Sequence, residues 1–239
     1  MPVPWLDPMD APVFPCTSRA LADPNGLLAA GGSLDADWLL AAYREGIFPW
    51  YEEGQPVLWW APDPRLVLDP GRVAVSRSLR KLIRKQIYRI SFDTAFTSVI
   101  EACQTSWGRE NATWITPEMK AAYVNLHRLG HAHSVEVWRD EFLVGGLYGI
   151  ALGKAFFGES MFSAQPNASK LALVALARQL ESREFGLIDC QVHSDHLVSM
   201  GAEALPRPDF QEALTALLAS KEQPGPWKTP PYNLMEKPS

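Results

Sequence analysis

The sequence is poor in cysteine and has no long apolar run. Its three cysteines, Cys16, Cys103 and Cys190, are odd in number and widely spaced, which argues against a disulfide framework. No apolar stretch approaches the roughly 20 residues of a membrane-spanning helix. The chain does not open on a basic start followed by an apolar run, so we expect no signal peptide. These absences predict a cytoplasmic protein that does not cross a membrane.

Several catalytic signatures are also missing. The chain has no Gly-x-Ser-x-Gly elbow, no Gly-x-x-x-x-Gly-Lys-Ser/Thr phosphate loop and no Gly-x-Gly-x-x-Gly dinucleotide turn. It also lacks the Arg/Gln-x-x-Gly-x-Gly/Ala loop of the kind that cradles the pyrophosphate of coenzyme A. The sequence therefore shows no evident site for a nucleotide or coenzyme A.

A zinc site could be assembled from His131 and His133, and from Cys190 with His193, Asp195 and His196 in the loop that follows. However, neither a Cys-x-x-Cys nor a His-Glu-x-x-His motif occurs. The loop residues fall at both odd and even positions, which does not place them on one face. We therefore expect structural or surface histidines, and no metal.

Positive charge is concentrated in one segment. The net charge is −5, yet residues 71–92 hold seven of the 22 basic residues and no acid. Helical spacing over 76–86 places Leu79, Leu82 and Ile83 on one face and the basic side chains on the other. Clustered cations on one helix face favour phosphate contacts through counterion release, although an ordinary solvated helix face would show the same pattern.

The first 65 residues differ in composition from the rest. They are rich in proline, glycine and tryptophan, and a helix is predicted over 35–45, with Gly46 as its C-terminal cap. Asp63 lies between two prolines, which indicates a domain boundary. We expect a small N-terminal domain over 1–65, a larger domain over 66–222 and a loosely held Pro-rich tail over 223–239.

The larger domain mixes helical and strand-like periodicity. Helices are predicted at 76–86, 94–104, 116–129, 168–183 and from Asp209 to about 220, and strands at 133–138, 142–151, 155–162 and 187–192. Short turns separate the first three strands, which favours antiparallel hairpins. The sum is an α+β fold with a mixed, largely antiparallel sheet, and the order of its elements resembles a GNAT-type acyltransferase.

The strand at 187–192 carries a carboxylate and a carboxamide among apolar residues. In strict alternation Asp189 and Gln191 share one face, and buried polar groups must be hydrogen-bonded. Asp189 could hold or deprotonate an amine, and Gln191 could orient a carbonyl or an amide. Equally, Asp189 could only satisfy buried backbone groups.

The strand at 155–162 places Glu159 among aromatic residues, whichever way it faces. A carboxylate in such surroundings usually has a cationic or amine partner. The alternative is a glutamate on an edge strand that faces water. Together with the basic helix and the missing coenzyme A loop, Glu159 favours transfer from a nucleic-acid donor.

Six blocks carry a family resemblance: Phe48–Trp50, Trp59–Arg65, Gly130–Trp138, Gly158–Ser163, Asn167–Lys170 and Leu187–Gln191. From about Phe14 to Phe210 the chain resembles the bacterial leucyl/phenylalanyl-tRNA–protein transferases. The resemblance implies an enzyme that moves Leu or Phe, and in some cases Met, from aminoacyl-tRNA to the N-terminal Arg or Lys of acceptor proteins. The new peptide bond creates an N-degron for proteolysis. It also implies a GNAT-like catalytic domain, no metal and no cofactor. A monomer is the default expectation.

The resemblance further implies roles for individual residues. It assigns the transfer itself to Asp189 and Gln191, with Asp189 acting directly or through Gln191. The implied aminoacyl-adenosine contacts are Glu159, Trp50, Trp114 and Tyr123. The implied amino-acid pocket consists of Leu147, Phe156, Leu173, Leu176, Leu180 and Ile188. The implied contacts to the tRNA backbone are Arg77, Arg80, Lys81, Arg84 and Lys85. We expect Asp189→Ala or Gln191→Ala to lower turnover while leaving the fold intact.

The chain departs from the family pattern at two positions. Leu176 and Leu180 stand where phenylalanines are expected, so the preference among Leu, Phe and Met stays open.

Two other functions compete with aminoacyl transfer: a coenzyme A-dependent N-acetyltransferase on the same fold, and a non-catalytic RNA-binding module that uses the basic helix.

Overall fold

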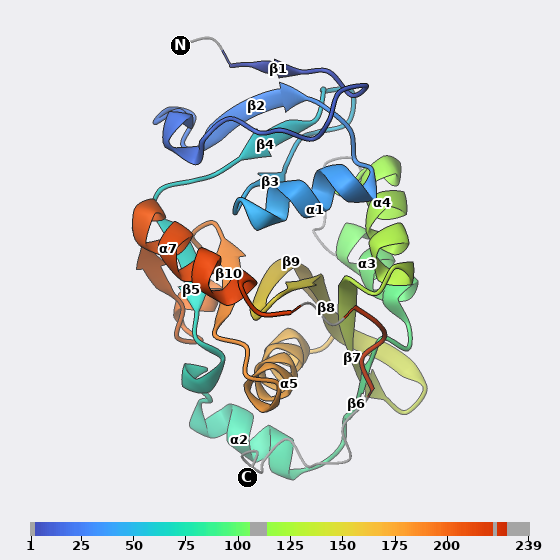
Figure 1. Cartoon of the computed structure of the whole chain (residues 1–239). Helices are drawn as coiled ribbons and strands as arrows, with labels where there is room; N and C mark the ends of the chain where they lie inside the picture. The colour runs from blue at the N-terminus through green and yellow to red at the C-terminus, as the bar shows by residue number, and fades with distance from the viewer. Residues whose placement is uncertain (1–2, 106–113, 222–223, 229–239) are drawn as a thin grey trace.

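The computed structural model describes residues 3–105, 114–221 and 224–228. It contains a four-stranded sheet, in the order β1-β2-β4-β3, and a seven-stranded sheet, in the order β11-β5-β10-β9-β8-β7-β6 (Figure 1). The smaller sheet comprises β1 (Trp5–Leu6), β2 (Leu27–Gly31), β3 (Phe48–Pro49) and β4 (Leu58–Trp60). The larger sheet comprises β5 (Arg65–Leu68), β6 (Arg89–Phe92), β7 (Ala132–Arg139), β8 (Phe142–Leu152), β9 (Ala155–Ser163), β10 (Leu187–Gln191) and β11 (Glu203–Leu205).

The larger sheet is antiparallel except where β9 and β10 run parallel. The predicted α+β class with a mixed, largely antiparallel sheet is therefore confirmed. The β9–β10 ladder pairs Leu187 with Ala155, Ile188 with Phe156 and Asp189 with Phe157, and extends no further. The two strands separate beyond this point, and the residues that follow on each strand border the opening.

Helices cover both faces of the larger sheet (Figure 1). Buried residues of α3 (Phe96–Thr105) and α4 (Pro117–Arg128) pack in one hydrophobic cluster, and those of α5 (Ala168–Ser182) and α2 (Arg77–Arg84) pack in another. The remaining helical segments are α1 (Ala36–Arg44), α6 (Asp195–Val198), α7 (Arg207–Leu218) and the 3-10 turns η1 (Thr17–Arg19) and η2 (Pro70–Arg72). The first cluster also includes residues of α1, so one core joins the smaller sheet to the larger one.

Most predicted helices begin within one residue of the predicted start. Thr116 accepts a hydrogen bond from Met119 N at 3.2 Å and is followed by Pro117 at the first helical position, as expected for α4. The prediction was wrong for α7, which begins at Arg207, before Asp209. The prediction also lacked the short strands β1 to β6 and β11, and α6 forms where a loop was expected.

The segment 224–228 is not loosely held, so that part of the tail prediction is wrong. Trp227 is 4% exposed and belongs to the α5 cluster. Residues 223 and 229–239 of the predicted tail lie outside the described part of the chain. No helix within the described residues is both long and apolar enough to span a bilayer.

Candidate active site

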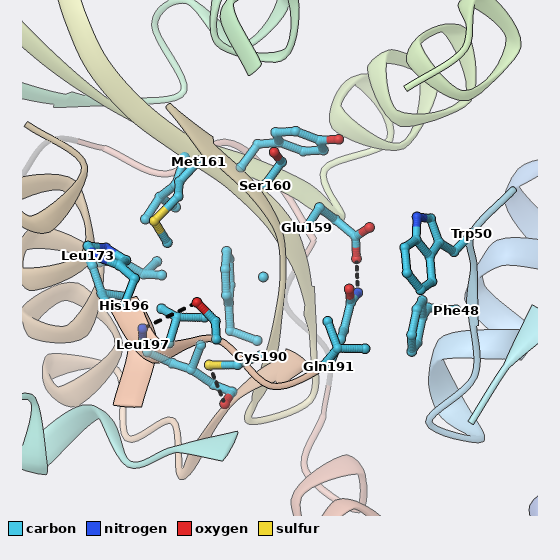
Figure 2. Close-up of a pocket in the computed structure, with 18 of the residues that line it drawn as sticks. Phe48, Trp50, Glu159, Ser160, Met161, Leu173, Cys190, Gln191, His196 and Leu197 are labelled. Carbon is cyan, nitrogen blue, oxygen red and sulfur yellow. Dashed lines mark hydrogen bonds between the residues drawn. The ribbon is translucent and has the colours of Figure 1, made fainter. Parts of the chain in front are cut away.

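A cavity of about 390 Å³ opens where β9 and β10 separate. Figure 2 shows Phe48 and Trp50 at one end, facing Glu159 and Gln191, while Leu173, Leu197 and His196 lie toward the opposite end. Most of the lining is apolar, and the Glu159–Gln191 pair forms a polar border next to the aromatic side chains of the smaller sheet. Such a site can hold an apolar group and present polar atoms at one end of it.

A break in the β10 ladder turns Gln191 into the cavity. The register against β5 shifts between Asp189 and Gln191, and Gln191 has a φ of 64°. Ile188, Cys190 and Gln191 all line the cavity, whereas Asp189 does not. The shared face that strict alternation predicted is therefore wrong at this point. The two residues remain linked, because Gln191 N donates to Asp189 Oδ1 at 2.9 Å.

Asp189 is bound by Arg65, a residue that was not predicted from the sequence to belong to the site. Arg65 Nε donates to Oδ1 at 2.8 Å and Arg65 Nη2 to Oδ2 at 2.6 Å. The guanidinium also lies 4.7 Å from the ring centre of Phe48 and 4.9 Å from that of Phe210. Arg65 ends the Trp59–Arg65 block, and a basic residue at a predicted domain boundary was the available signal for it. Because Arg65 binds both carboxylate oxygens, Asp189 does not face the cavity and instead supports the backbone of Gln191.

Glu159 is the carboxylate that does line the cavity. Its Oε1 accepts from Tyr43 Oη at 2.8 Å and from Gln191 Nε2 at 2.9 Å, and its Oε2 accepts from Tyr123 Oη at 2.8 Å (Figure 2 draws the bond to Gln191). Burial raises the pKa of Glu159 from 4.5 to about 7, against the opposing effect of the two tyrosine hydrogen bonds. The Glu159 carboxyl thus titrates near neutral pH, and three hydrogen-bond donors contact it.

The aromatic residues expected around a terminal adenosine divide into two groups. Trp50, which is 44% exposed, and Trp114 both line the cavity. Tyr123 does not, because it is 0% exposed and its hydroxyl is engaged with Glu159 and with Tyr43 Oη at 2.6 Å. Tyr123 is therefore placed to position Glu159, not to stack on a base. Tyr43, which the sequence argument missed, shares this role from the buried face of α1.

The expected amino-acid pocket is largely assembled. Its members Leu147, Phe156, Leu173, Leu176 and Ile188 all line the cavity. Leu180 does not, because it is 0% exposed and packs in the α5 cluster. The lining also includes residues that were not predicted, among them Met161, Cys190, His196 and Leu197. Burial raises the pKa of the Cys190 thiol well above its ordinary value, so this cysteine is not a thiolate.

The basic helix is α2, which Ser76 caps by accepting a hydrogen bond from Leu79 N at 3.2 Å. Its buried residues are Leu79 and Ile83. The five cations expected on it are exposed, and within the described residues none forms an ion pair: Arg77, Arg80, Lys81, Arg84 and Lys85. Figure 1 shows α2 at the bottom of the molecule, below α5, and none of the residues that line the cavity belongs to α2. The same described region contains no cluster of three or more His, Cys, Asp or Glu residues able to hold a metal ion.

Solved structures similar to this chain are distant. A GCN5-related N-acetyltransferase from Kribbella flavida is 14% identical with a TM-score of 0.35, covering 70% of this chain and 60% of that one. L-PGS from Bacillus licheniformis is 9% identical with a TM-score of 0.41, covering 73% and 56%. Likenesses this weak carry no argument about function.

Sequence relatives are much closer. Residues 32–63 match the family model of the leucyl/phenylalanyl-tRNA protein transferase N-terminal domain, and residues 67–215 match that of leucyl/phenylalanyl-tRNA protein transferase. The leucyl/phenylalanyl-tRNA–protein transferase of Azoarcus sp. is 56% identical over 225 residues, covering 94% of this chain and 95% of that protein. The one of Nitrosomonas eutropha is 55% identical, covering 90% and 92%. The chain belongs to the leucyl/phenylalanyl-tRNA–protein transferase family.

Proposed function

We propose that this chain transfers Leu or Phe, and in some cases Met, from aminoacyl-tRNA to the N-terminal Arg or Lys of acceptor proteins. The product carries one additional residue at its N-terminus, which marks it as an N-degron in the cytoplasm. The observation that carries the proposal is the apolar cavity bordered by the hydrogen-bonded pair Glu159 and Gln191, with the exposed ring of Trp50 beside them. The cavity can hold an apolar side chain, the polar pair can meet the reacting carbonyl, and the Trp50 ring can stack on a nucleotide base.

The apolar end of the cavity suits the amino-acid side chain. Leu147, Phe156, Leu173, Leu176 and Ile188 supply its walls. The volume of about 390 Å³ lies within the range of small-molecule sites, roughly 300 to 1,000 Å³. Trp50 and Trp114 are then placed to stack on the terminal adenosine, and such stacking contributes about 1–3 kcal/mol per base.

The reaction needs no cofactor, because the aminoacyl ester is already activated. The neutral α-amine of the acceptor attacks the ester carbonyl carbon, the C–N bond forms and the bond to the ribose oxygen breaks. The amine proton ends on that leaving oxygen. Positioning the amine against the carbonyl is therefore the main task of the site.

Gln191 is the residue best placed for this task. The bond from its Nε2 to Glu159 fixes the amide plane and so orients Oε1 of the same amide, to which an incoming amine can donate. Asp189 supports the backbone of Gln191 and is itself held by Arg65, which favours a positioning role. Glu159 is the carboxylate within the cavity that can take up the proton of an arriving ammonium group.

The tRNA is then held by α2. Its five exposed cations supply the phosphate contacts, and duplex RNA is bound mainly through its backbone and shape. A non-catalytic RNA-binding module would use the same helix, yet it would have no need of the buried Glu159–Gln191 pair.

The decisive experiment supplies both substrates. The protein is incubated with Leu-tRNA or Phe-tRNA and a peptide that begins with Arg, and the peptide mass is measured. We expect the mass of one added residue, and none on the same peptide with an acetylated N-terminus. Absence of product under single-turnover conditions overturns the proposal. Acetyl transfer from acetyl-coenzyme A to the same peptide would instead support the N-acetyltransferase.

A further inference from the structure

The segment 224–228 contacts the turn that follows α4 and places Trp227 in the hydrophobic cluster of α5. Gly225 N donates to Gly130 O at 3.0 Å, and Trp227 N donates to Asp93 Oδ2 at 2.6 Å. The fit is close, because a Cβ added at Gly130 would lie 2.2 Å from Gly225 N. Both hydrogen bonds fix the backbone on either side of residue 226, so the position of the Trp227 side chain is defined.

The indole of Trp227 is enclosed by planar groups. It stacks on His133 with the ring centres 4.0 Å apart and the planes at 11°, and the Arg183 guanidinium lies 5.0 Å from its ring centre. His133 is itself fixed, because its Nδ1 lies 2.8 Å from Asp93 Oδ2. Aromatic stacking and cation–π contacts of this kind hold a ring in a defined orientation. The ring is therefore a rigid surface inside the fold.

That surface supports one wall of the cavity. The ring centres of Trp227 and Phe156 are 5.8 Å apart, and Phe156, which is buried, lines the cavity. Phe156 is also constrained by Gly149, where an added Cβ would lie 2.6 Å from the Phe156 ring. The position of this wall thus depends on Gly149 and Trp227 together.

We propose that Trp227 is a positioning residue that fixes the shape of the amino-acid pocket through Phe156 and so contributes to the choice between aminoacyl side chains. The inference rests on the proposed function and goes beyond it. Trp227 also lies outside the residues that match the two family models, 32–63 and 67–215. Protein cores resist small displacements, and a large-to-small change leaves a cavity into which neighbours relax only in part. Removing the indole should let the Phe156 ring move away from the substrate and deepen the pocket.

A purely structural role for Trp227 makes a different prediction. It would lower stability and reduce the rates with all aminoacyl-tRNAs by the same factor. A positioning role changes the ratio of kcat/KM between Phe-tRNA and Leu-tRNA, because a deeper pocket favours the larger side chain. Small apolar differences of this kind correspond to about tenfold or more in discrimination when the wall is fully formed.

The test compares Trp227→Ala, Trp227→Phe and Leu214→Ala in a competition between Phe-tRNA and Leu-tRNA. Leu214 is a matched control, since it is a 1% exposed core residue of α7 that does not line the cavity. We expect Trp227→Ala to raise the Phe-to-Leu ratio of kcat/KM at least threefold. Trp227→Phe should restore most of the wild-type ratio, and Leu214→Ala should leave the ratio within a factor of two of wild type.

A folded Trp227→Ala enzyme with the wild-type ratio overturns the inference, as does an equal shift in Leu214→Ala. If Trp227→Ala does not fold, Trp227→Leu takes its place, because it keeps an apolar side chain there but removes the ring beside Phe156. It should show the same shift, and an unchanged ratio in it overturns the inference equally. A wild-type protein that transfers neither amino acid refutes the proposed function instead, so the two failures are distinguishable.

Discussion

Both carboxylate oxygens of Asp189 accept hydrogen bonds from Arg65, at 2.8 and 2.6 Å, and the two side chains are 0% and 1% exposed. The pair joins β10 to β5 directly behind Gln191. This relationship changes what a substitution of Asp189 measures. Ala at this position was expected to lower turnover with the fold intact, but it would leave a buried arginine without its partner.

Asp189→Ala should therefore destabilise the protein by about 3–5 kcal/mol, the usual cost of breaking a buried ion pair. Urea unfolding followed by fluorescence measures the loss. The matched control is Asp189→Leu combined with Arg65→Met, which replaces both charges by apolar groups and should recover most of the stability without activity. Full stability in Asp189→Ala alone would show that the pair is not what holds this end of β10.

Gln191 is the position where activity separates from stability. Its φ of 64° suits glycine, so Gln191→Gly removes the amide side chain without backbone strain. We expect turnover to fall by on the order of 100-fold, because positioned groups of this kind contribute that much, while the unfolding free energy changes by less than about 1 kcal/mol. Single-turnover kinetics at saturating tRNA give the rate. A rate within a factor of three of wild type would remove Gln191 from the mechanism.

Glu159 should make stability depend on pH in a defined direction. Burial raises its pKa from 4.5 to about 7, so its contribution is complete below pH 4.5 and is lost as the pH rises through 7. Glu159→Gln lacks this loss, and its amide can keep the hydrogen bonds of the protonated acid. We expect it to be more stable than wild type at pH 8 by at most about 3 kcal/mol, with the difference vanishing near pH 4.5. Urea unfolding at the two pH values tests this, and an equal difference at both would contradict it.

The helices and long strands were predictable because their periodicity and capping residues are local. Thr116 and Pro117 determine the start of α4 without reference to the rest of the chain. Short strands such as β1 and β3 have two residues each, and their existence depends on partners far away in sequence. No window of local sequence contains that information, so these strands were missed.

The site was predictable in its residue types but not in its contacts. The sequence indicated Asp189, Gln191 and Glu159 as unusual polar residues in apolar strands. It could not indicate the register shift that turns Gln191 toward Glu159, nor the hydrogen bonds from Arg65 to Asp189. Both depend on the pairing of β10 with β5. Trp227 was missed for a related reason. The proline-rich composition of its segment gives no information about the distant residues against which the segment packs.

The cations of α2 should determine affinity for tRNA and its dependence on salt. Replacing Arg80, Lys81 and Arg84 by Ala should raise the KM for tRNA by on the order of tenfold. The slope of log KM against log salt should fall by up to about three, since each phosphate contact contributes about 0.9. The matched control replaces three exposed arginines elsewhere, Arg19, Arg44 and Arg128. An unchanged salt slope in the α2 variant would assign that helix to solvation alone.

The two leucines of α5 that depart from the family pattern should behave differently from each other. Leu176 lines the cavity, whereas Leu180 is fully buried in the core behind it. Leu176→Phe places extra volume inside the pocket, so it should reduce kcat/KM for Phe-tRNA at least tenfold more than for Leu-tRNA. Leu180→Phe overpacks the core and should cost about 1–3 kcal/mol of stability with little change in that ratio. Competition assays and urea unfolding on both variants separate the effects. If Leu180→Phe shifted the preference as strongly as Leu176→Phe, selection would depend on the packing of α5 as a whole rather than on the side chains that touch the substrate.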